Sequence, residues 1–590
     1  MAVRFRMLRE RLGLRFDGAF GDSSGRSVPP PLPTLPLEGR ALAGAAAALV
    51  MLTAGTAQAQ TQTAPFGAPV ASGPTIAGQD CRTRDAWPPL LRTWLELTSP
   101  PGETPGNATF CLRPEQVAEV LERARDAQAR LAEADTADSV IRWVTPENSG
   151  SSAGDPSSAL WMFPVLLKDN IETADMPTTA GSLALAENAP GRDAPLVTRL
   201  REAGAIIFGK TNLSEWANIR SSNSISGWSA VGGQTLNPYD PARTPCGSSS
   251  GSAVAVAIGL APAAIGTETD GSITCPASVN GVVGFKPTVG LVSRTHIVPI
   301  SHSQDTAGPI TTTVEDAARV LTVIAGTDPL DPATAEADAH LWDADGILRT
   351  FEDQLDRGSL RGARIGVMRF LLPSYSPETR EVFERSLQVM RDAGAVIVDI
   401  DAPPADWRNI GTWELQVLMS ELKVDLNAYL ASTDPAQVKT RTLADLIAFN
   451  TAEPRETVLF GQELFLRAEA TTGLEDPVYV NARASSLRAA GPEGIDKMMA
   501  DNAVAALIAP TTSRAWTNDR EDEDNMQGSA SRLAAVAGYP HLTVPMGFDR
   551  GMPVGISFMA GKWEDAKVLS LGYAFEQLTH ARRAPQAPRD

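Results

Sequence analysis

The sequence predicts an α/β fold in which helices cover both faces of one large mixed, mostly parallel β-sheet. The chain has 590 residues, of which 43% are hydrophobic, so it can bury a large core. Apolar runs of strand length, such as 160–167 and 505–510, show no alternation of apolar and polar residues. Such runs are typical of strands that are buried on both faces. Predicted helices lie between several of the runs, and that order favours a sheet between two helical layers.

The predicted elements follow one another along most of the chain. Pro114 begins the first predicted helix, because proline is favoured in the first helical turn. Segments 196–203 and 252–260 are also predicted to be helical, and a further element begins at Gly209. The remaining predicted strands are 205–208, 263–266, 364–368, 395–399, 542–546 and 554–558.

The first 59 residues differ from the rest and predict a leader with a secretory signal peptide. Arg40 precedes an apolar run over 41–52, and Ala57-Gln-Ala59 follows as an A-x-A cleavage site. The run is too short to span a bilayer as a stable helix, although an ordinary alanine-rich helix is the alternative. We therefore expect an exported protein, periplasmic or secreted, with no membrane association after cleavage. The segment before Arg40 is long for such a leader, so we expect translation to start downstream of Met1.

The rest of the chain divides into an extension and one folded domain. Residues 60–110 are rich in Thr, Pro and Gly and are predicted to be an N-terminal extension. Residues 111–585 are predicted to form the folded domain. Within it, residues 410–500 have weak strand signals and are predicted to form a helical cap over the sheet.

Charge and composition exclude several kinds of partner. The net charge of -19 disfavours nucleic acid, because phosphate contacts need a basic surface. It disfavours an anionic membrane surface for the same reason. The five histidines form no metal-binding pair and the cysteines have no C-x-x-C spacing, so we expect no metal and no cofactor.

The four cysteines form two pairs along the sequence. Cys81 and Cys111 flank a short Pro- and Gly-rich segment, and they form either a disulfide or two free thiols. Cys246 and Cys275 lie among serines and alanines, where we expect them to behave as buried small hydrophobic residues.

Residues 246–287 are dense in serine, glycine and alanine, which indicates acyl-transfer chemistry. Serine clusters surround Ser248 and Ser272. The run Gly247–Gly251 also matches G-x-S-x-G, which would make Ser249 the nucleophile of an α/β-hydrolase. That motif should follow a buried strand, whereas residues 237–245 contain three prolines and predict a loop. The α/β-hydrolase interpretation is therefore disfavoured.

A serine hydrolase without a suitable histidine needs another base, and Lys168 is the candidate. Lysine acts as a base only when it is neutral, and burial lowers its pKa by disfavouring the charged form. Lys168 stands at the end of the apolar run 160–167, where such burial is expected. The alternative is a solvated charge at a strand end.

Three motifs together resemble the amidase signature family. They are Lys168-Asp-Asn-Ile171, Gly247–Ser252 and Gly266–Ile273, followed by Cys275-Pro276 and 281–287. The resemblance extends from about residue 112 to 583. Within the family, segments 213–218, 224–229 and 538–540 are similar to bacterial peptide amidases, secreted enzymes that hydrolyse C-terminal peptide amides.

The resemblance implies the amidase signature fold and a Ser–cis-Ser–Lys triad. By motif, Ser272 is the nucleophile, Ser248 is the bridging serine in a cis peptide, and Lys168 is the base. The backbone N–H groups that would face the oxyanion belong to Thr269, Asp270, Gly271 and Ser272. Ser249 either supports this network or is a packed loop hydroxyl. The implied reaction is hydrolysis of a carboxamide, from a peptide or a small molecule, to the free acid and ammonia.

Two other functions are compatible with such a scaffold. One is a glutamine-hydrolysing subunit of a tRNA-dependent amidotransferase, which the export signal and the lack of a basic patch disfavour. The other is a non-catalytic peptide-binding protein, which the intact triad positions disfavour.

Overall fold

The structure is a computed structural model that describes residues 137–143, 158–161, 163–518 and 527–585, together with two short strands. These strands, β1 (Asp80–Arg82) and β2 (Phe110–Leu112), pair antiparallel with Cys81 opposite Cys111 in register. The predicted leader, most of the extension and the helix from Pro114 lie outside the described residues. Within the described part, no helix combines the length and apolar character needed to cross a bilayer.

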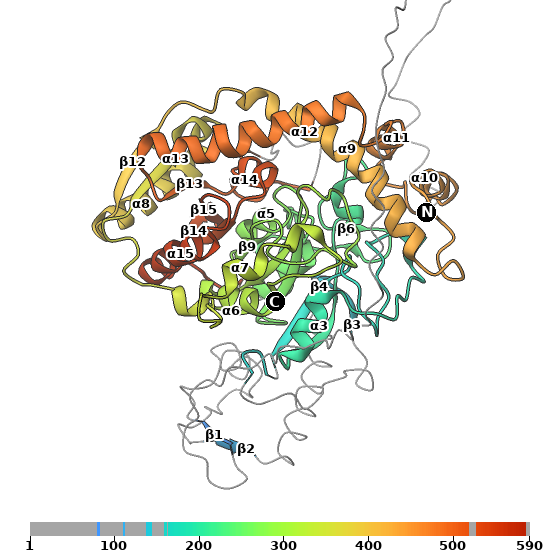
Figure 1. Cartoon of the computed structure of the whole chain (residues 1–590), viewed down its shortest axis with the longest axis horizontal. Helices are drawn as coiled ribbons and strands as arrows, with labels where there is room; N and C mark the ends of the chain where they lie inside the picture. The colour runs from blue at the N-terminus through green and yellow to red at the C-terminus, as the bar shows by residue number, and fades with distance from the viewer. Residues whose placement is uncertain are drawn as a thin grey trace, which may run out of the picture. The chain divides into compact units, whose positions relative to one another are not determined.

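One eleven-stranded sheet forms the centre of the fold (Figure 1). Its strand order is β12-β11-β13-β15-β14-β9-β10-β8-β4-β5-β3. The strands are β3 (Val140–Trp143), β4 (Pro164–Lys168), β5 (Ile206–Thr211), β8 (Ala263–Glu268), β9 (Val283–Lys286), β10 (Thr306–Thr311), β11 (Arg364–Met368), β12 (Val396–Ile400), β13 (Ala506–Pro510), β14 (His541–Asp549) and β15 (Met552–Met559).

The sheet is mixed, as predicted, but its pairings are not mostly parallel. In the described part of the chain, four of its ten strand pairings are parallel and six are antiparallel. The parallel pairs are β12–β11–β13 and β8–β4–β5, on either side of a largely antiparallel centre. One of the antiparallel pairings has a local cause, because antiparallel neighbours can be joined by a tight turn whereas parallel neighbours need a long crossover. Arg550 and Gly551, both with positive φ, join β14 to β15 in such a hairpin.

Helices cover both faces of the sheet. Neighbouring residues of β4 show this directly, because Leu166 packs in one core cluster while Val165 and Leu167 pack in another. Helix α4 (Ser250–Ala257) contributes to the first cluster, and the helices that contribute to the second include α3 (Pro195–Glu202), α6 (Val314–Ile324), α8 (Pro377–Asp392), α14 (Ser531–Ala537) and α15 (Asp565–Thr579). Burial on both faces explains why these strands show no apolar–polar alternation.

The boundaries of several elements differ from the prediction. The run 160–167 begins with a turn, and strand β4 starts only at Pro164. Strand β5 continues through Gly209 to Thr211, so no new element begins at Gly209. The strand over 364–368 has the predicted limits.

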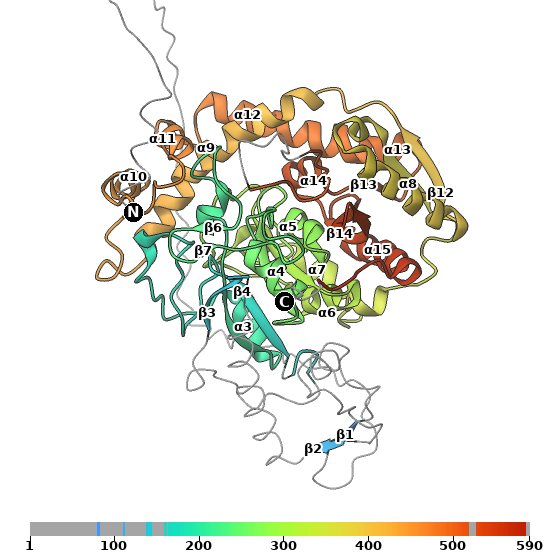
Figure 2. The same ribbon diagram turned by 180° about the vertical axis from the view of Figure 1, so that it is seen from behind.

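The interval 410–500 is largely helical, as predicted. Its helices are α9 (Trp407–Ser432), α10 (Leu443–Ala452), α11 (Glu463–Glu469) and α12 (Pro477–Ala490), and α13 (Lys497–Asn502) follows. Figures 1 and 2 show α9 to α12 together along one edge of the molecule. A separate core cluster joins α9, α10 and α11 to Leu185 and Trp216, which lie in short 3-10 turns after β4 and β5, and to Ile300 in a loop. These helices are therefore packed against the loops that follow the strands.

Candidate active site

Lys168 is fully buried at the end of β4, with no exposed surface. Its Nζ lies 2.7 Å from Ser248 Oγ and donates to Thr267 Oγ1 at 2.8 Å and to Thr267 O at 3.2 Å. The structure thus brings together two of the three residues of the implied triad. It excludes the alternative of a solvated lysine at a strand end.

Burial lowers the pKa of Lys168 to about 7, because the charged ammonium loses its hydration. Nearby Asp305 and Glu268 act in the opposite direction, since negative charge favours the ammonium. At neutral pH a substantial fraction of Lys168 is therefore unprotonated. A lysine in this state can accept a proton from a neighbouring hydroxyl.

Ser248 is held between Lys168 and the loop after β5. The peptide bond between Gly247 and Ser248 is cis, which is the conformation that the resemblance implies. The carbonyl of Ser248 accepts a hydrogen bond of 3.0 Å from the backbone N–H of Ser214. Its hydroxyl is fully buried beside Lys168 and is placed for proton relay.

The hydroxyl of Ser249 is engaged with strand β8. It donates to the carbonyl of Thr267 at 3.1 Å and accepts from the N–H of the same residue at 3.2 Å. Thr267 in turn accepts hydrogen bonds from Lys168, so Ser249 supports the residue that holds the candidate base. A hydroxyl bound in this way and fully buried has no approach to a substrate, which argues against the G-x-S-x-G interpretation.

Ser272 lies in the turn that follows β8. Its residue has an exposed fraction of 8%, whereas Ser248 and Ser249 have none, so Ser272 is the least enclosed of the three serines. The N–H of Ser249 donates to the carbonyl of Ser272 at 3.1 Å, which places the two serine clusters side by side. Gly271, immediately before it, has φ of +80°, a conformation that glycine adopts readily.

Three acidic or amide side chains that sequence reasoning missed hold this turn. Glu268 Oε2 accepts from the N–H groups of Ile273 at 2.7 Å and Thr274 at 3.0 Å. Asp305 Oδ1 accepts from Thr269 Oγ1 at 2.6 Å, and Gln304 Nε2 donates to Thr269 O at 3.3 Å. Glu268 lies inside the motif Gly266–Ile273, but no local signal points to Asp305 or Gln304, because they act across the fold.

Asp305 is itself fixed by two backbone donors. Its Oδ2 accepts from Ile300 N at 2.7 Å and Ser301 N at 2.9 Å. Burial raises the pKa of Asp305 to about 6, while these hydrogen bonds limit the rise. Asp305 therefore links loop 300–305 to the turn that carries Thr269, and its charge also acts on Lys168.

Cys246 and Cys275 form a disulfide, which corrects the expectation that they are buried thiols. Their Cα atoms lie 6.0 Å apart, although the residues are separated by 29 positions in the sequence. The predicted burial is correct, with exposed fractions of 4% and 5%. The error arose because the fold packs α5 (Thr274–Val279) beside the Ser248 segment, and the spacing of the two cysteines does not reveal this. For Cys81 and Cys111, a disulfide and two free thiols both stay open.

One group of potential metal ligands lies beside loop 300–305. His302, Glu421 and Asp425 offer ligand atoms within 4.8 Å of one another. Glu421 already accepts hydrogen bonds from Tyr479 OH at 2.7 Å and Ser303 N at 3.1 Å. His302 Nδ1 lies 2.9 Å from Asp425 Oδ2. This group is satisfied by protein contacts and anchors the loop to α9.

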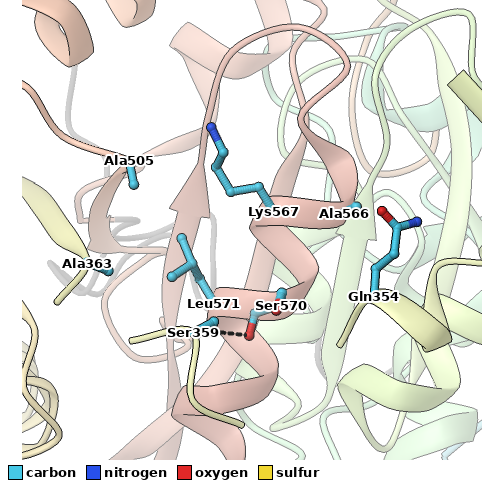
Figure 3. A pocket seen from close by; sticks show the side chains of 8 residues that line it. All are labelled: Gln354, Ser359, Ala363, Ala505, Ala566, Lys567, Ser570 and Leu571. Carbon is cyan, nitrogen blue, oxygen red and sulfur yellow. Dashed lines mark hydrogen bonds between the residues drawn. The ribbon is translucent and has the colours of Figure 1, made fainter. Parts of the chain in front are cut away.

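A separate pocket with a volume of about 360 Å³ lies beside α15 (Figure 3). Its lining residues are Gln354, Ser359, Ala363, Ala505, Ala566, Lys567, Ser570 and Leu571. Ser359 Oγ donates to the carbonyl of Ser570 at 2.8 Å across one side of it. None of the residues around Lys168 lines this pocket, so it is distinct from the candidate active site.

Comparison with known proteins identifies the family. A family model described as Amidase matches residues 115–569. The chain belongs to the amidase family. It is therefore an amide-hydrolysing enzyme with the amidase signature fold.

Individual amidases are similar over most of the chain. The crystal structure of native peptide amidase from Stenotrophomonas maltophilia is 45% identical, with a TM-score of 0.72, over 80% of this chain and 98% of that one. A peptide amidase in complex with the competitive inhibitor chymostatin is 46% identical, with a TM-score of 0.73 and the same coverage. A probable amidase of Arabidopsis thaliana is 40% identical over 72% of this amidase and 78% of its own length. A glutamyl-tRNA(Gln) amidotransferase subunit of Gloeobacter violaceus is 34% identical over 78% and 93%.

Proposed function

We propose that this amidase hydrolyses C-terminal amides of peptides to the free acid and ammonia, through an acyl-enzyme on Ser272. The observation that carries the proposal is the contact of 2.7 Å between Lys168 Nζ and Ser248 Oγ in a fully buried environment. It supplies a base and a relay without histidine. In the proposal Ser272 is the third member of the triad, since its backbone carbonyl accepts from the N–H of Ser249 and its residue keeps some exposed surface.

The reaction proceeds in two stages that share one proton relay. Ser272 Oγ attacks the carbon of the substrate amide, and its proton moves to Ser248 Oγ while Ser248 passes its own proton to neutral Lys168. The relay then returns a proton to the nitrogen, the C–N bond breaks, and ammonia leaves. Water attacks the ester carbon by the same route and releases the acid with Ser272 regenerated.

A pKa of about 7 suits Lys168 both for accepting a proton and for returning it. A group whose pKa is close to the working pH can accept a proton in one step and return it in the next. A lysine with an ordinary pKa would remain protonated near pH 7 and could not start the attack.

The turn before Ser272 supports stabilisation of the oxyanion. In the described part of the chain, the N–H groups of Asp270, Gly271 and Ser272 have no acceptor within the protein. They are therefore available to a developing negative charge on the substrate oxygen. Loss of one such donor typically lowers kcat by about 10²–10³-fold.

Likeness to peptide amidases supports a peptide amide as the substrate. The peptide amidase structures are 45% and 46% identical to this chain, whereas the amidotransferase subunit from Gloeobacter violaceus is 34% identical. A glutamine-hydrolysing subunit is the second candidate, since that relative is matched over 93% of its length. The two candidates differ in the size of the acyl group that the site must accept.

Export is part of the proposal. The apolar run over 41–52 and the Ala57-Gln-Ala59 site support a signal peptide. The Cys246–Cys275 disulfide supports an oxidising compartment, because disulfides are rare in the reducing cytosol. N-terminal sequencing of the protein from its native source tests this directly. Cleavage near Ala59 is expected, and an intact N-terminus on a cytosolic protein would refute export.

Ammonia release is the deciding experiment for the activity. The purified protein is expected to release ammonia from an amidated dipeptide faster than from glutamine, from an aryl amide or from a fatty amide. Ser272→Ala is expected to abolish release while its circular dichroism spectrum remains native. Hydrolysis of glutamine alone would favour the amidotransferase function. Undiminished release by Ser272→Ala would refute the assigned nucleophile.

A further inference from the structure

The disulfide between Cys246 and Cys275 joins the two segments that carry the proposed reacting serines. Cys246 stands two residues before Ser248, and Cys275 stands three residues after Ser272. Along the backbone, the connection between the serines runs through the whole of α4 and β8. The path through the disulfide is far shorter, so the crosslink directly limits how far the two serine segments can separate.

Hydrogen bonds lie on both sides of this crosslink. On the side of the serines, the N–H of Ser249 donates to the carbonyl of Ser272 at 3.1 Å. On the other side, Asn280 Nδ2 donates to the carbonyl of Pro245 at 2.8 Å. Because such hydrogen bonds can lengthen or break locally, the disulfide is the part of this contact that fixes the spacing covalently.

The disulfide lies in a buried, apolar environment. Both cysteines are buried, and they pack with Val279, Ala515 and Met552 in a small apolar cluster. Ser250 Oγ also donates to the carbonyl of Cys246 at 2.6 Å, which ties the start of α4 to the same point. The crosslink is therefore an internal part of the site, unlike a surface disulfide that joins two loops.

We propose that the Cys246–Cys275 disulfide is a positioning element of catalysis, which holds the Ser248 segment in register with the Ser272 segment during proton transfer. The inference rests on the proposed function, since it acts through these two serines. Proton transfer requires heavy atoms about 2.6–3.2 Å apart. A displacement of about 1 Å in a catalytic group can lower the rate about 10²-fold. Loss of the crosslink therefore lowers kcat more than it raises KM.

The test compares two double variants that each remove one pair of cysteines. Cys246→Ala/Cys275→Ala removes the internal crosslink, and Cys81→Ala/Cys111→Ala is the matched control outside the catalytic segments. For each we measure kcat and KM with an amidated dipeptide, the rate of Ser272 labelling by a fluorophosphonate, and the melting temperature. We expect the first variant to lose about 10- to 100-fold in kcat with KM within about threefold. Labelling is expected to slow in parallel, and the control is expected to keep the wild-type kcat.

A lower melting temperature with an unchanged kcat, measured where the variant is folded, would show that the disulfide only stabilises the fold and would overturn the proposal. Wild-type protein purified under a reductant provides a second measurement should the double variant not fold. We expect its kcat to rise as the Cys246 and Cys275 thiols are oxidised. Mass spectrometry of quenched samples measures how much of this thiol pair remains at each time. An equal kcat before and after oxidation would also overturn the proposal.

The proposed function is tested separately in the same assay. Wild-type protein that releases no ammonia from any peptide amide contradicts the function, whatever the cysteine variants do. Wild-type release that Ser272→Ala abolishes, together with full activity of the Cys246→Ala/Cys275→Ala variant, contradicts only the role of the disulfide.

Discussion

The Asp305 carboxylate accepts a hydrogen bond of 2.6 Å from the hydroxyl of Thr269, the first residue of the proposed oxyanion turn. The same carboxylate accepts from the backbone N–H groups of Ile300 and Ser301. It also raises the pKa of Lys168 against the larger effect of burial. One partly buried acid therefore links the oxyanion turn to loop 300–305 and influences the charge of the candidate base.

Asp305→Asn is expected to shift the acid limb of the pH–activity profile to lower pH. The negative charge of Asp305 raises the pKa of Lys168, whereas burial lowers it. Without that charge the pKa of Lys168 falls below about 7, so the lysine becomes neutral at lower pH. The profile of kcat/KM against pH reports this pKa in the free enzyme. Asp316→Asn is the control, because Asp316 is a buried carboxyl in α6 that is not among the charges acting on Lys168. A shift of equal size in both variants would contradict the prediction.

Lys168→Met is expected to lower kcat/KM by about 10²–10⁴-fold, the usual contribution of a general base. The change removes the proton acceptor while it keeps a long apolar stem in the same space. Lys286→Met is the control, since Lys286 is equally buried but donates to the carbonyl of Pro287 at 3.0 Å. Steady-state kinetics on the folded variants measure the difference. A similar fall in kcat/KM in the two variants would contradict a specific role for Lys168 as the base, because the removal of either buried lysine would then reduce activity equally.

Ser249→Ala is expected to reduce stability by about 1–3 kcal/mol, because it leaves the buried N–H of Thr267 without its acceptor. Activity should fall but remain measurable, since Ser249 supports Lys168 only through Thr267. Urea unfolding and ammonia release measure the two effects. Complete loss of activity with unchanged stability would instead make Ser249 the nucleophile.

His302 is expected to make a small contribution to stability that depends on pH. Its hydrogen bond with Asp425 raises the pKa of the imidazole above 6.5, while burial and Arg294 oppose the rise and Glu421 adds to it. Because the folded state binds the proton more tightly, this contribution is present in full below the unfolded pKa. It is lost as the pH rises through the folded pKa.

The His302→Gln variant removes this titration. Its melting temperature should change less than that of the wild type between about pH 5.5 and 8, the range in which histidine titrates. The effect is limited by solvent, since 44% of the His302 side chain is exposed. Identical pH dependence in the two proteins would contradict the assignment.

Much of this architecture was predictable because the relevant signals are local. Continuous apolar runs indicated buried strands such as β11 and β13, and the structure places Leu166 and Leu167 against opposite core clusters. The position of Lys168 after such a run indicated its burial, which the structure shows. These features depend on a few neighbouring residues.

The features that were missed depend on which segments meet in space. Antiparallel pairing of β9 with β10 and β14 brings together residues whose partners no local pattern identifies. The contact of Asp305 with Thr269 and the bond between Cys246 and Cys275 belong to the same class. A single sequence reveals the chemistry of each residue but not the neighbour that another part of the fold supplies.

In the proposed mechanism, the burial of Lys168 makes catalytic competence a product of folding. In the unfolded chain this lysine has its ordinary pKa near 10.5 and is protonated at neutral pH. Strands β4 and β8, which lie almost a hundred residues apart, must pair before the side chain is enclosed with Thr267. Under the proposed mechanism an unfolded chain therefore carries no neutral base to activate Ser272, and the enzyme gains the ability to cleave amides only when it folds.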